Sequence, residues 1–594
     1  METKHGEGTT PWWLSQRRWL PAALAVLSAL YGVISIWSAV SPHDRYRFKM
    51  LAEFVPGPVT LTAGLLVVAS GMVLILLAHG LRRRKRRAWR LAVGICAVLI
   101  VTHVGKGLDL EEAFLALVLL ALLVYGRAEF TAKGDRSTRL IAVAAVVVIY
   151  AVGFIAGMLA IGVYHRKLTG HPTLLAAAWT TVRGFIGQTG PVQYRNVRYE
   201  SLATTFLVSV TVLAIIIGAY LLLRPLEPKA YLTNDDSKRL HELLDRFGSR
   251  DSLGYFALRT DKSVVWSPTG KAAVPYRVVA GVALASGDPI GDPEAWPGAI
   301  KPFIELCREY AWLPAVIGCS EQGGTVYARE AGLHVLEIGD EAVVQVADFS
   351  LSGRTMRNVR QTVNRVKRAG YVARVRRLSE LTQAEVAEIA RVAAAWRGAE
   401  TERGFSMALG RFGDPEDGDC VVVTAHTVDP EEPGAERLRA LLNFVPWGPD
   451  GLSLDLMRRD RDADGGLNEF LICSLMEQCG GLGVKRVSLN FAMFRSALAR
   501  GEKLGAGPVS RMWSRLLTFA SRWWQIESLY RFNEKFAPTW MPRFVCYPSA
   551  GSLIRIAMAA MEAEAFWTRP AAIRRLAGRV PLGYGERQAV QNSQ

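Results

Sequence analysis

The segment Ser453-Leu-Asp-Leu-Met-Arg-Arg459 places a carboxylate and a guanidinium three residues apart in a predicted strand. Leucines alternate with other residues from Leu452 to Leu456, and a period of two is typical of a strand. Strict alternation would put Asp455 and Arg458 on opposite faces of the sheet. Both can meet one ligand only if the strand bulges or ends near Met457, and bulges are common beside active sites. The alternative interpretation is an edge-strand ion pair without a chemical role.

A carboxylate and a guanidinium in one cleft could contact one ligand through charge-assisted hydrogen bonds. No Ser-His-Asp or Cys-His arrangement is legible, so we expect no covalent acyl-enzyme. The seven cysteines show neither a C-x-x-C motif nor clustering with histidine. We therefore expect buried free thiols, no metal site and no cofactor.

A basic helix is predicted between Ser352 and Tyr371. Apolar residues recur in it at helical spacing, arginines form a second stripe, and no acidic residue follows until Glu380. Uncompensated arginine on one face suits a phosphate backbone, although a solvated helix face is the alternative. The candidate RNA-binding residues are Arg354, Arg357, Arg365 and Arg368.

Aromatic and basic residues are dense between Ser528 and Tyr547. A pocket for an aminoacyl ester or an RNA terminus needs aromatic stacking and cationic donors together. The alternative is an aromatic loop that packs on the core. If the segment serves the site, Lys535 should approach Asp455 and Arg458, and the cleft should be lined by Tyr530, Phe532 or Trp540.

The elements that must position these residues follow a repeated order. From Asp235 to Ser350 the pattern mixes helices with short strands. After the basic helix the order begins again, with a helix at Thr382–Trp396, several strands, a helix at Leu467–Leu482 and a strand at Arg486–Phe491. We predict two similar α/β units joined by the basic helix.

The first third of the 594-residue chain is predicted to be a multi-span α-helical membrane domain. Two shorter apolar stretches, Leu91–Val104 and Ala113–Tyr125, would bring the number of crossings to about six. The segment Pro172–Ile186 could form an interfacial helix. The stretches long enough to cross a hydrocarbon core of about 30 Å are Leu20–Val40, Val59–Leu81, Ile141–Tyr164 and Leu202–Leu223.

Charge predicts the orientation of this domain and the class of partner. The loop Leu81–Arg90 is the densest basic cluster, and placing it in the cytoplasm puts the N-terminus inside. Six crossings then make everything from about Pro225 onward cytosolic. The formal net charge of +17 favours nucleic acid or anionic lipid headgroups as partners. The scarcity of charged residues inside the spans argues against a transporter with a regulatory cytosolic domain.

Several ordered motifs together resemble the phosphatidylglycerol lysyltransferase family, also called lysylphosphatidylglycerol synthases or multiple peptide resistance factors. The resemblance covers about Leu232–Ala565 and looks most like the actinobacterial branch. The motifs are Gly287-Asp-Pro-Ile-Gly291, Phe349-Ser-Leu-Ser-Gly-Arg354, Ser453-Leu-Asp-Leu-Met-Arg458, Asn468-Glu469, Val487-Ser-Leu-Asn-Phe-Ala-Met-Phe-Arg495 and Tyr530-Arg-Phe-Asn-Glu-Lys-Phe536.

The resemblance implies a fold and a domain order. A multi-span α-helical membrane domain should precede a cytosolic α/β region of two tandem GNAT-like acyltransferase units. The expected segments are a cytoplasmic N-terminus (1–19), a transmembrane domain (20–224), a first GNAT-like unit (232–352), a basic linker helix (353–377), a second, catalytic unit (378–566) and a basic tail (567–594).

The resemblance also implies transfer of an aminoacyl group, lysyl by family frequency, from aminoacyl-tRNA to the hydroxyl of phosphatidylglycerol. The product would lower the negative surface charge of the membrane and give resistance to cationic antimicrobial peptides. Asp455, Arg458 and Lys535 would be catalytic, and Arg354, Arg357, Arg365 and Arg368 would bind tRNA. The implied substrate-binding residues are Glu469, Asn490, Tyr530, Arg531, Asn533 and Arg543.

Two departures from the family pattern shape the expected partners. Many members have a larger membrane domain that also flips the product lipid, which makes flipping doubtful here. Some actinobacterial relatives carry a fused lysyl-tRNA synthetase, whereas this chain ends soon after Leu553–Phe566, so a separate synthetase should supply Lys-tRNA. Self-association into a homo-oligomer is possible. The alternatives are another amino acid (alanine, arginine or ornithine), diacylglycerol as acceptor, or a non-catalytic lipid- or tRNA-binding membrane protein.

Overall fold

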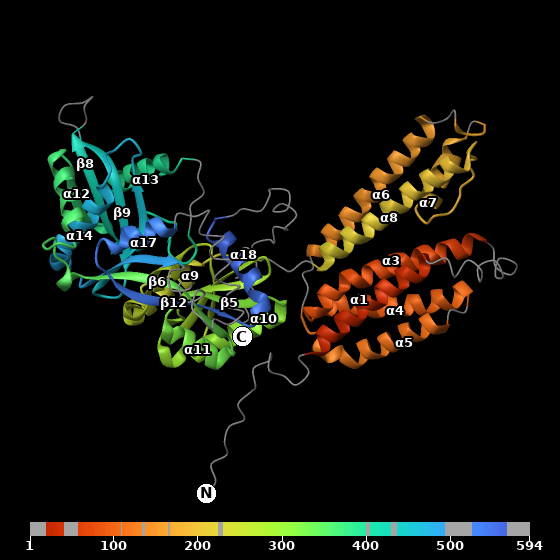
Figure 1. The fold of residues 1–594 in the computed structure, drawn as a ribbon, viewed down its shortest axis with the longest axis horizontal. Coiled ribbons are helices and arrows are strands. Elements are labelled where there is room, and N and C mark those ends of the chain that lie inside the picture. Colours follow the sequence, from red (N-terminus) through yellow and green to blue (C-terminus); the bar gives the residue numbers. More distant parts are fainter. Residues whose placement is uncertain are drawn as a thin grey trace, which may run out of the picture. The chain divides into compact units, whose positions relative to one another are not determined.

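The computed structural model describes residues 19–40, 57–107, 110–132, 137–163, 167–170, 172–223, 228, 230–398, 404–428, 436–493 and 526–566. The expected cytoplasmic N-terminus before Trp19 and the expected basic tail lie outside these residues. The chain divides into two compact units, one consisting mainly of residues 1–226 and the other mainly of residues 227–594 (Figure 1).

All six apolar stretches predicted as spans are helices. Their bounds are α1 (Leu20–Val40), α3 (Gly57–Arg82), α4 (Arg86–Gly107), α5 (Leu110–Tyr125), α6 (Ser137–Val163) and α8 (Val197–Leu223). Within the described residues, three segments are long and apolar enough to cross a membrane: Leu20–Ser38, Leu140–Val163 and Arg198–Leu222. The expected number of six crossings stays a prediction.

The segment between α6 and α8 contains the helix expected near a membrane surface. It is α7 (Leu174–Gly184), which begins at Thr173, whose hydroxyl accepts a hydrogen bond from the amide of Ala176. Leu174 and Leu175 expose their side chains, while Thr181 is buried against the neighbouring helices. This is the amphipathic division that an interfacial helix requires.

The second unit is built on one twelve-stranded sheet (Figure 1). Its strand order is β1-β2-β3-β5-β12-β6-β11-β10-β9-β8-β7, with the short β4 paired to β2. The strands are β1 (Ser263–Trp266), β2 (Ala272–Val279), β3 (Val282–Ser286), β4 (Ile290–Gly291), β5 (Leu313–Cys319), β6 (His334–Gln345), β7 (Val372–Arg377), β8 (Val421–Val428), β9 (Glu436–Pro446), β10 (Gly451–Arg459), β11 (Arg486–Met493) and β12 (Thr539–Tyr547).

The two halves of this sheet have the same connection, as predicted. In the first half, β3 is followed by α10 (Trp296–Tyr310) and then by β5, which is parallel to β3. In the second half, β10 is followed by α14 (Leu467–Leu482) and then by the parallel strand β11. Each half therefore contains antiparallel strands, a crossover helix and one parallel pair.

The halves also exchange strands, which the sequence did not predict. After β5, α11 (Glu321–Ala331) leads to β6, and β6 pairs with β11 of the second half. After β11, the chain returns through α17 (Ile526–Glu534) to β12, which pairs with β5 of the first half. β6 and β12 also pair with each other. β12, expected in the second unit, thus pairs with β5 of the first half, and β7, expected in the linker, is the edge strand of the second half.

Helices cover both faces of the second half (Figure 1). On one face, α14 and α12 (Arg357–Arg368) pack on alternate residues of β8 and β9, such as Val423 and Leu442. On the other face, α9 (Asn234–Phe247) and α13 (Gln383–Arg397) pack on the residues between them, such as Val422 and Leu441. Thr233 caps the start of α9, because its hydroxyl accepts a hydrogen bond from the backbone amide of Asp236. The sheet therefore separates an α14 face from an α13 face.

Candidate active site

β10 contains the bulge that the sequence predicted. Leu454 pairs with Phe444 of β9, and Leu456 pairs with the preceding residue, Asn443, so Asp455 is the extra residue. Leu454 and Met457 both pack on the α14 face although they are three residues apart, whereas Leu456 packs on the α13 face. The bulge thus reverses the alternation, and it lies two residues before the expected position.

The bulge opens Asp455 and Arg458 into one cavity of about 190 Å³ on the α13 face. Small side chains of α13 form one wall, and a loop at residues 408–412 forms another. The lining residues are Ala390, Ala393, Ala394, Arg397, Ala408, Gly410, Arg411, Phe412, Asp455, Leu456 and Arg458. The expectation that Asp455 and Arg458 share a cleft is confirmed. Arg397 and Arg411 were not predicted.

The Asp455 carboxylate is held at both oxygens. The backbone amide of Leu409 donates to Oδ1 at 2.6 Å, and the Asn443 side-chain amide donates to Oδ2 at 2.9 Å. Two further hydrogen bonds hold the segment that contains Leu409. Arg259 Nη1 donates to the Ala408 carbonyl at 2.9 Å, and the Glu564 carboxylate accepts a hydrogen bond from the amide of Ser406 at 3.0 Å. Asp455 therefore orients the cavity wall as well as opening into the cavity.

Arg411 lines the cavity from this loop, and two carboxylates bind its guanidinium. Its Nη2 donates to Asp417 at 2.8 Å, and its Nη1 lies 3.6 Å from Asp414. Burial raises the pKa of Asp417, which also accepts a 2.9 Å hydrogen bond from the Tyr255 hydroxyl. Asp414 and Asp417 therefore balance the charge of Arg411 at the wall of the cavity.

β10 and β11 separate next to the bulge. Their parallel pairing covers only Gly451–Ser453 and Arg486–Ser488. Beyond it, Asn490 adopts a left-handed backbone conformation with φ 69° and donates its side-chain amide to the Leu454 carbonyl at 2.7 Å. Asn490, expected to bind substrate, therefore lies at the point where the strands part, beside Asp455.

Lys535 does not reach this cavity. It follows α17, and its Nζ lies 2.8 Å from Glu469 Oε1 near the start of α14. α14 covers the opposite face of the sheet, so the expected meeting of Lys535 with Asp455 is wrong for this structure. Tyr530 stacks on Trp540 at 5.0 Å between ring centroids, but the aromatic ring that lines the cavity is Phe412. The expected aromatic lining from Tyr530, Phe532 or Trp540 is also wrong for this cavity.

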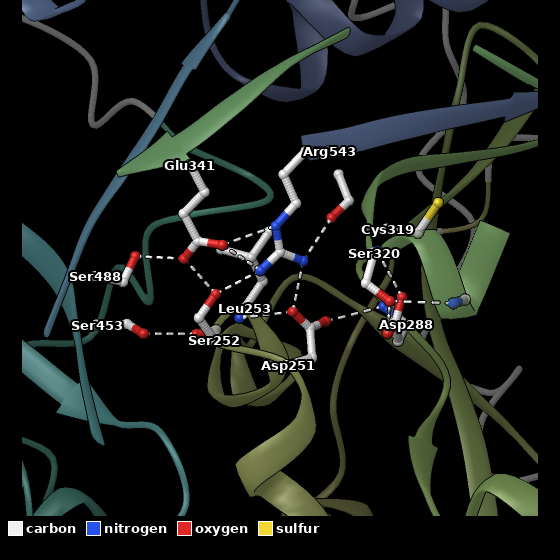
Figure 2. A network of polar contacts seen from close by, with 12 residues as sticks. Asp251, Ser252, Leu253, Asp288, Cys319, Ser320, Glu341, Ser453, Ser488 and Arg543 are labelled. Atoms are coloured by element: carbon white, nitrogen blue, oxygen red, sulfur yellow. Dashed lines mark hydrogen bonds and ion pairs between the residues drawn. The ribbon is translucent and has the colours of Figure 1, made fainter. Parts of the chain in front are cut away.

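Arg543 lies in an internal network rather than at a substrate surface (Figure 2). Its guanidinium donates to Glu341 and Asp251, at 2.9 Å and 2.7 Å, and to the Gly318 carbonyl at 3.2 Å. Its side chain is 4% exposed. The expectation that Arg543 binds substrate is corrected to a structural role. Asn533 is likewise buried and donates to the Leu489 carbonyl, whereas Arg531 is exposed.

The basic helix is amphipathic as predicted. Val359, Val363 and Val366 of α12 are buried, and its arginines face outward. Three of the four expected RNA-binding residues belong to α12, and Arg354 precedes it. Arg365 donates to the Gly465 carbonyl and Arg368 to the Asn364 carbonyl, and within the described residues neither forms an ion pair with an acidic side chain.

The basic stretch contains no acidic residue of its own, but part of it forms ion pairs in the fold. Acidic residues from distant segments pair with the later members of the stretch. The pairs are Lys367 with Glu477, Arg374 with Glu436, Arg376 with Glu385, and Arg377 with Asp419. The basic surface is therefore narrower than the sequence indicates and is centred on α12.

Comparison with known proteins settles the family. The model of the family described as "Phosphatidylglycerol lysyltransferase, C-terminal" matches residues 241–547, more than half of the chain. The chain belongs to the phosphatidylglycerol lysyltransferase family. A second model, described as "Transmembrane region of lysyl-tRNA synthetase", matches residues 16–223. The family and the two-part organisation predicted from the sequence are confirmed.

Two curated relatives illustrate the similarity over nearly the whole chain. The chain is 40% identical over 572 residues to the lysylphosphatidylglycerol biosynthesis bifunctional protein LysX of Mycobacterium avium, covering 94% of this chain and 47% of the relative. Identity to LysX of Rhodococcus jostii is 41% over 556 residues, covering 92% and 48%. This member of the phosphatidylglycerol lysyltransferase family thus spans about half the length of the curated relatives it matches.

Solved structures show only distant similarity. L-PGS from Bacillus licheniformis is 20% identical, with a TM-score of 0.49, and the match covers 58% of this chain and 100% of that one. The C-terminal domain of a lysylphosphatidylglycerol synthetase homologue from Agrobacterium fabrum is 23% identical, with a TM-score of 0.47, covering 56% and 98%. At this distance, neither structure informs the chemistry of the present site.

Proposed function

We propose that this protein transfers an aminoacyl group, most simply lysyl, from aminoacyl-tRNA to a glycerol hydroxyl of phosphatidylglycerol. The observation that carries the proposal is the bulge at Asp455, which opens Asp455 and Arg458 into one cavity within the family-matched region. The name of the relatives, lysylphosphatidylglycerol biosynthesis bifunctional protein, supports lysine as the transferred residue.

The reaction needs no further activation because an aminoacyl ester is already reactive. The lipid hydroxyl oxygen attacks the ester carbonyl carbon, a new carbon–oxygen bond forms, and the bond to the tRNA terminal ribose breaks. The proton of the lipid hydroxyl passes to the departing ribose oxygen. The protein lowers the barrier by orienting both substrates and by stabilising the oxyanion that develops on the carbonyl.

Asp455 and Arg458 have different roles in this reaction. Asp455 accepts hydrogen bonds at both oxygens, an arrangement that favours a fixed anion over a free proton acceptor. We assign to it the positioning of the aminoacyl group and of the cavity wall. Arg458, three residues on, is the donor for the oxyanion or for the lipid phosphate. Glu469 and Lys535, which pair with each other near the start of α14, stay predicted substrate contacts outside this cavity.

The remaining elements supply the two macromolecular surfaces. The exposed arginines of α12 are proposed to bind the tRNA backbone, and the helical unit is proposed to hold the protein in the bilayer with residues from about 225 onward in the cytoplasm. Supply of Lys-tRNA by a separate synthetase and self-association also stay predictions. Because the product carries an added positive charge, its expected effect is resistance to cationic antimicrobial peptides.

Lipid extraction from cells that express the protein, followed by mass spectrometry, tests this function. We expect a new lipid heavier than phosphatidylglycerol by one lysyl residue. A mass corresponding to alanine, arginine or ornithine would change the donor, and a modified diacylglycerol would change the acceptor. The proposal fails if no aminoacylated lipid accumulates although the full-length protein is present in the membrane.

A further inference from the structure

The side-chain oxygen of Asn443 is buried and accepts no hydrogen bond from the residues that the structure describes. Its side chain is 3% exposed, and its Nδ2 donates to Asp455 Oδ2 at 2.9 Å. Because an ionised carboxylate only accepts hydrogen bonds, the amide nitrogen must face Asp455, and this fixes the direction of Asn443 Oδ1. Within the described part of the chain, that oxygen is buried and makes no hydrogen bond.

Asn490 repeats this arrangement from the other side of β10. Its Nδ2 donates to the Leu454 carbonyl, which is again only an acceptor, so the orientation of the amide is fixed. Asn490 Oδ1 is also buried and has no donor among the residues that the structure covers. A buried acceptor left without a donor lowers stability, and such groups are rare in folded proteins.

The two unpartnered oxygens flank the bulge. Asn443 lies on β9, where it pairs with Leu456 of β10. Asn490 lies on β11, on the other side of β10, and donates to the Leu454 carbonyl. Asp455 lies between Leu454 and Leu456, so the two asparagines make their hydrogen bonds to Asp455 and to the residue before it, where β10 and β11 part. Three acceptors, one of them charged, form a site for a group that has several donors and a positive charge.

We infer that Asn443 Oδ1, Asn490 Oδ1 and the Asp455 carboxylate bind the α-ammonium of the aminoacyl group. An ammonium has donors only, whereas a lipid hydroxyl brings one donor and a phosphate diester brings none. This inference rests on the proposed function and names where its donor substrate is held. The cavity lining includes Arg397, Arg411 and Arg458 but neither asparagine, so the cationic end of the substrate lies on the asparagine side of Asp455.

Discrimination between an α-amino and an α-hydroxy donor tests this site. The substrates are Lys-tRNA and the same tRNA carrying 6-amino-2-hydroxyhexanoate, which replaces only the α-ammonium with a hydroxyl. For the full-length wild-type protein we expect kcat/KM to favour Lys-tRNA by roughly 100-fold or more, because a site built for several donors rejects an analogue that lacks them.

The variants Asn443→Ala and Asn490→Gly should lower this ratio to below about 10-fold by slowing only the reaction of Lys-tRNA. Glycine suits position 490 because it tolerates the φ of 69°. Asn468 offers a matched control, since its Oδ1 is also buried without a donor but it lies on α14 across the sheet. Asn468→Ala should leave the ratio unchanged.

The inference is overturned if both variants slow the two donors equally, because the asparagines then only hold the bulge and water satisfies their oxygens. It is also overturned if the wild-type ratio is near one. If the wild-type protein transfers nothing to phosphatidylglycerol, the proposed function fails and a binding measurement decides the site separately. Calorimetry should then show lysine ethyl ester binding about 10-fold more tightly than ethyl 6-aminohexanoate, with this preference lost in Asn490→Gly. Equal binding by the wild-type protein contradicts the site.

Discussion

Arg543 and Glu341 form a buried ion pair in which Nε and Nη2 of the guanidinium donate to the same carboxylate oxygen, at 2.9 Å and 2.5 Å (Figure 2). The two residues are on β12 and β6, the strands that the two halves exchange. Asp251 adds a second carboxylate at 2.7 Å, and the Ser252 and Ser488 hydroxyls donate to the other oxygen of Glu341. The exchange of strands is thus fixed by a charged network as well as by backbone pairing.

Replacing Arg543 with methionine should destabilise the α/β unit by about 3–5 kcal/mol, because Glu341 and Asp251 would stay buried without their cation. Thermal unfolding of the purified protein measures this. Arg391→Met is the control, since the pair of Arg391 with Glu388 is exposed on α13 and its loss should leave the unfolding midpoint nearly unchanged. Equal unfolding midpoints for the two variants would show that the network does not stabilise the exchange.

Asp288 should make stability depend on pH. Burial, with the nearby Asp251 as a second cause, raises the pKa of Asp288 to about 7 from 3.8. Between about pH 4 and 7 the folded protein therefore holds a proton that the unfolded chain has released, so stability falls as pH rises through this window. Asp288→Asn keeps an acceptor for the Ser320 amide and removes the titration. The decrease in unfolding midpoint from pH 5 to pH 7 should be smaller in Asp288→Asn, and an unchanged decrease would contradict this assignment.

The α12 arginines should carry the salt dependence of tRNA binding. Changing Arg357, Arg365 and Arg368 to glutamine should weaken the affinity for tRNA. It should also reduce the slope of log K against log salt concentration by about 2, because binding with fewer phosphate contacts releases fewer counterions. Filter binding over a range of salt concentrations measures the slope. The control variant loses the same charge on the α13 face and should leave the slope nearly unchanged. Its substitutions are Lys238, Arg246 and Arg391 to glutamine. If both triple variants behave alike, α12 is an ordinary solvated face.

The orientation of the helical unit follows from its basic loop. A reporter fused after Leu226 should be active in the cytoplasm, because the arginine-rich loop between α3 and α4 favours the cytoplasmic side. A phosphatase reporter that works only outside the cytoplasm should be inactive at the same junction. An active phosphatase there would place the α/β unit where no charged tRNA is available.

Local patterns predicted most elements of the fold. Hydropathy located the six long helices of the first unit, and helical periodicity gave α14 the bounds that the structure shows. The bulge followed from a conflict between alternation and chemistry at Asp455 and Arg458. These features are encoded within about 20 neighbouring residues, which is why they are legible in the sequence.

Contacts between residues far apart in the chain could not be predicted from the sequence. The insertion of β12 beside β5 brings Arg543 to Asp251, nearly 300 residues earlier, and no local pattern records that meeting. Lys535 was expected at Asp455 because both occur in family motifs, but the sheet separates them. Asn443 did leave a signal, since it is the single amide in the apolar run Ala440-Leu-Leu-Asn-Phe-Val445. Arg397 and Arg411 left none, because each follows an ordinary helix or turn pattern.

The central claim is that Asp455 and Arg458 act together on one substrate in the cavity that the bulge opens. The most direct measurement is the rate at which radiolabelled lysine moves from tRNA to phosphatidylglycerol in vesicles, for the wild-type protein and for Asp455→Asn and Arg458→Gln. The account predicts that each variant loses transfer by roughly 100-fold or more and that the double variant loses little beyond the single ones, since both residues act in one step. Both variants should unfold within a few degrees of the wild type. Near wild-type transfer by either folded variant would contradict the account.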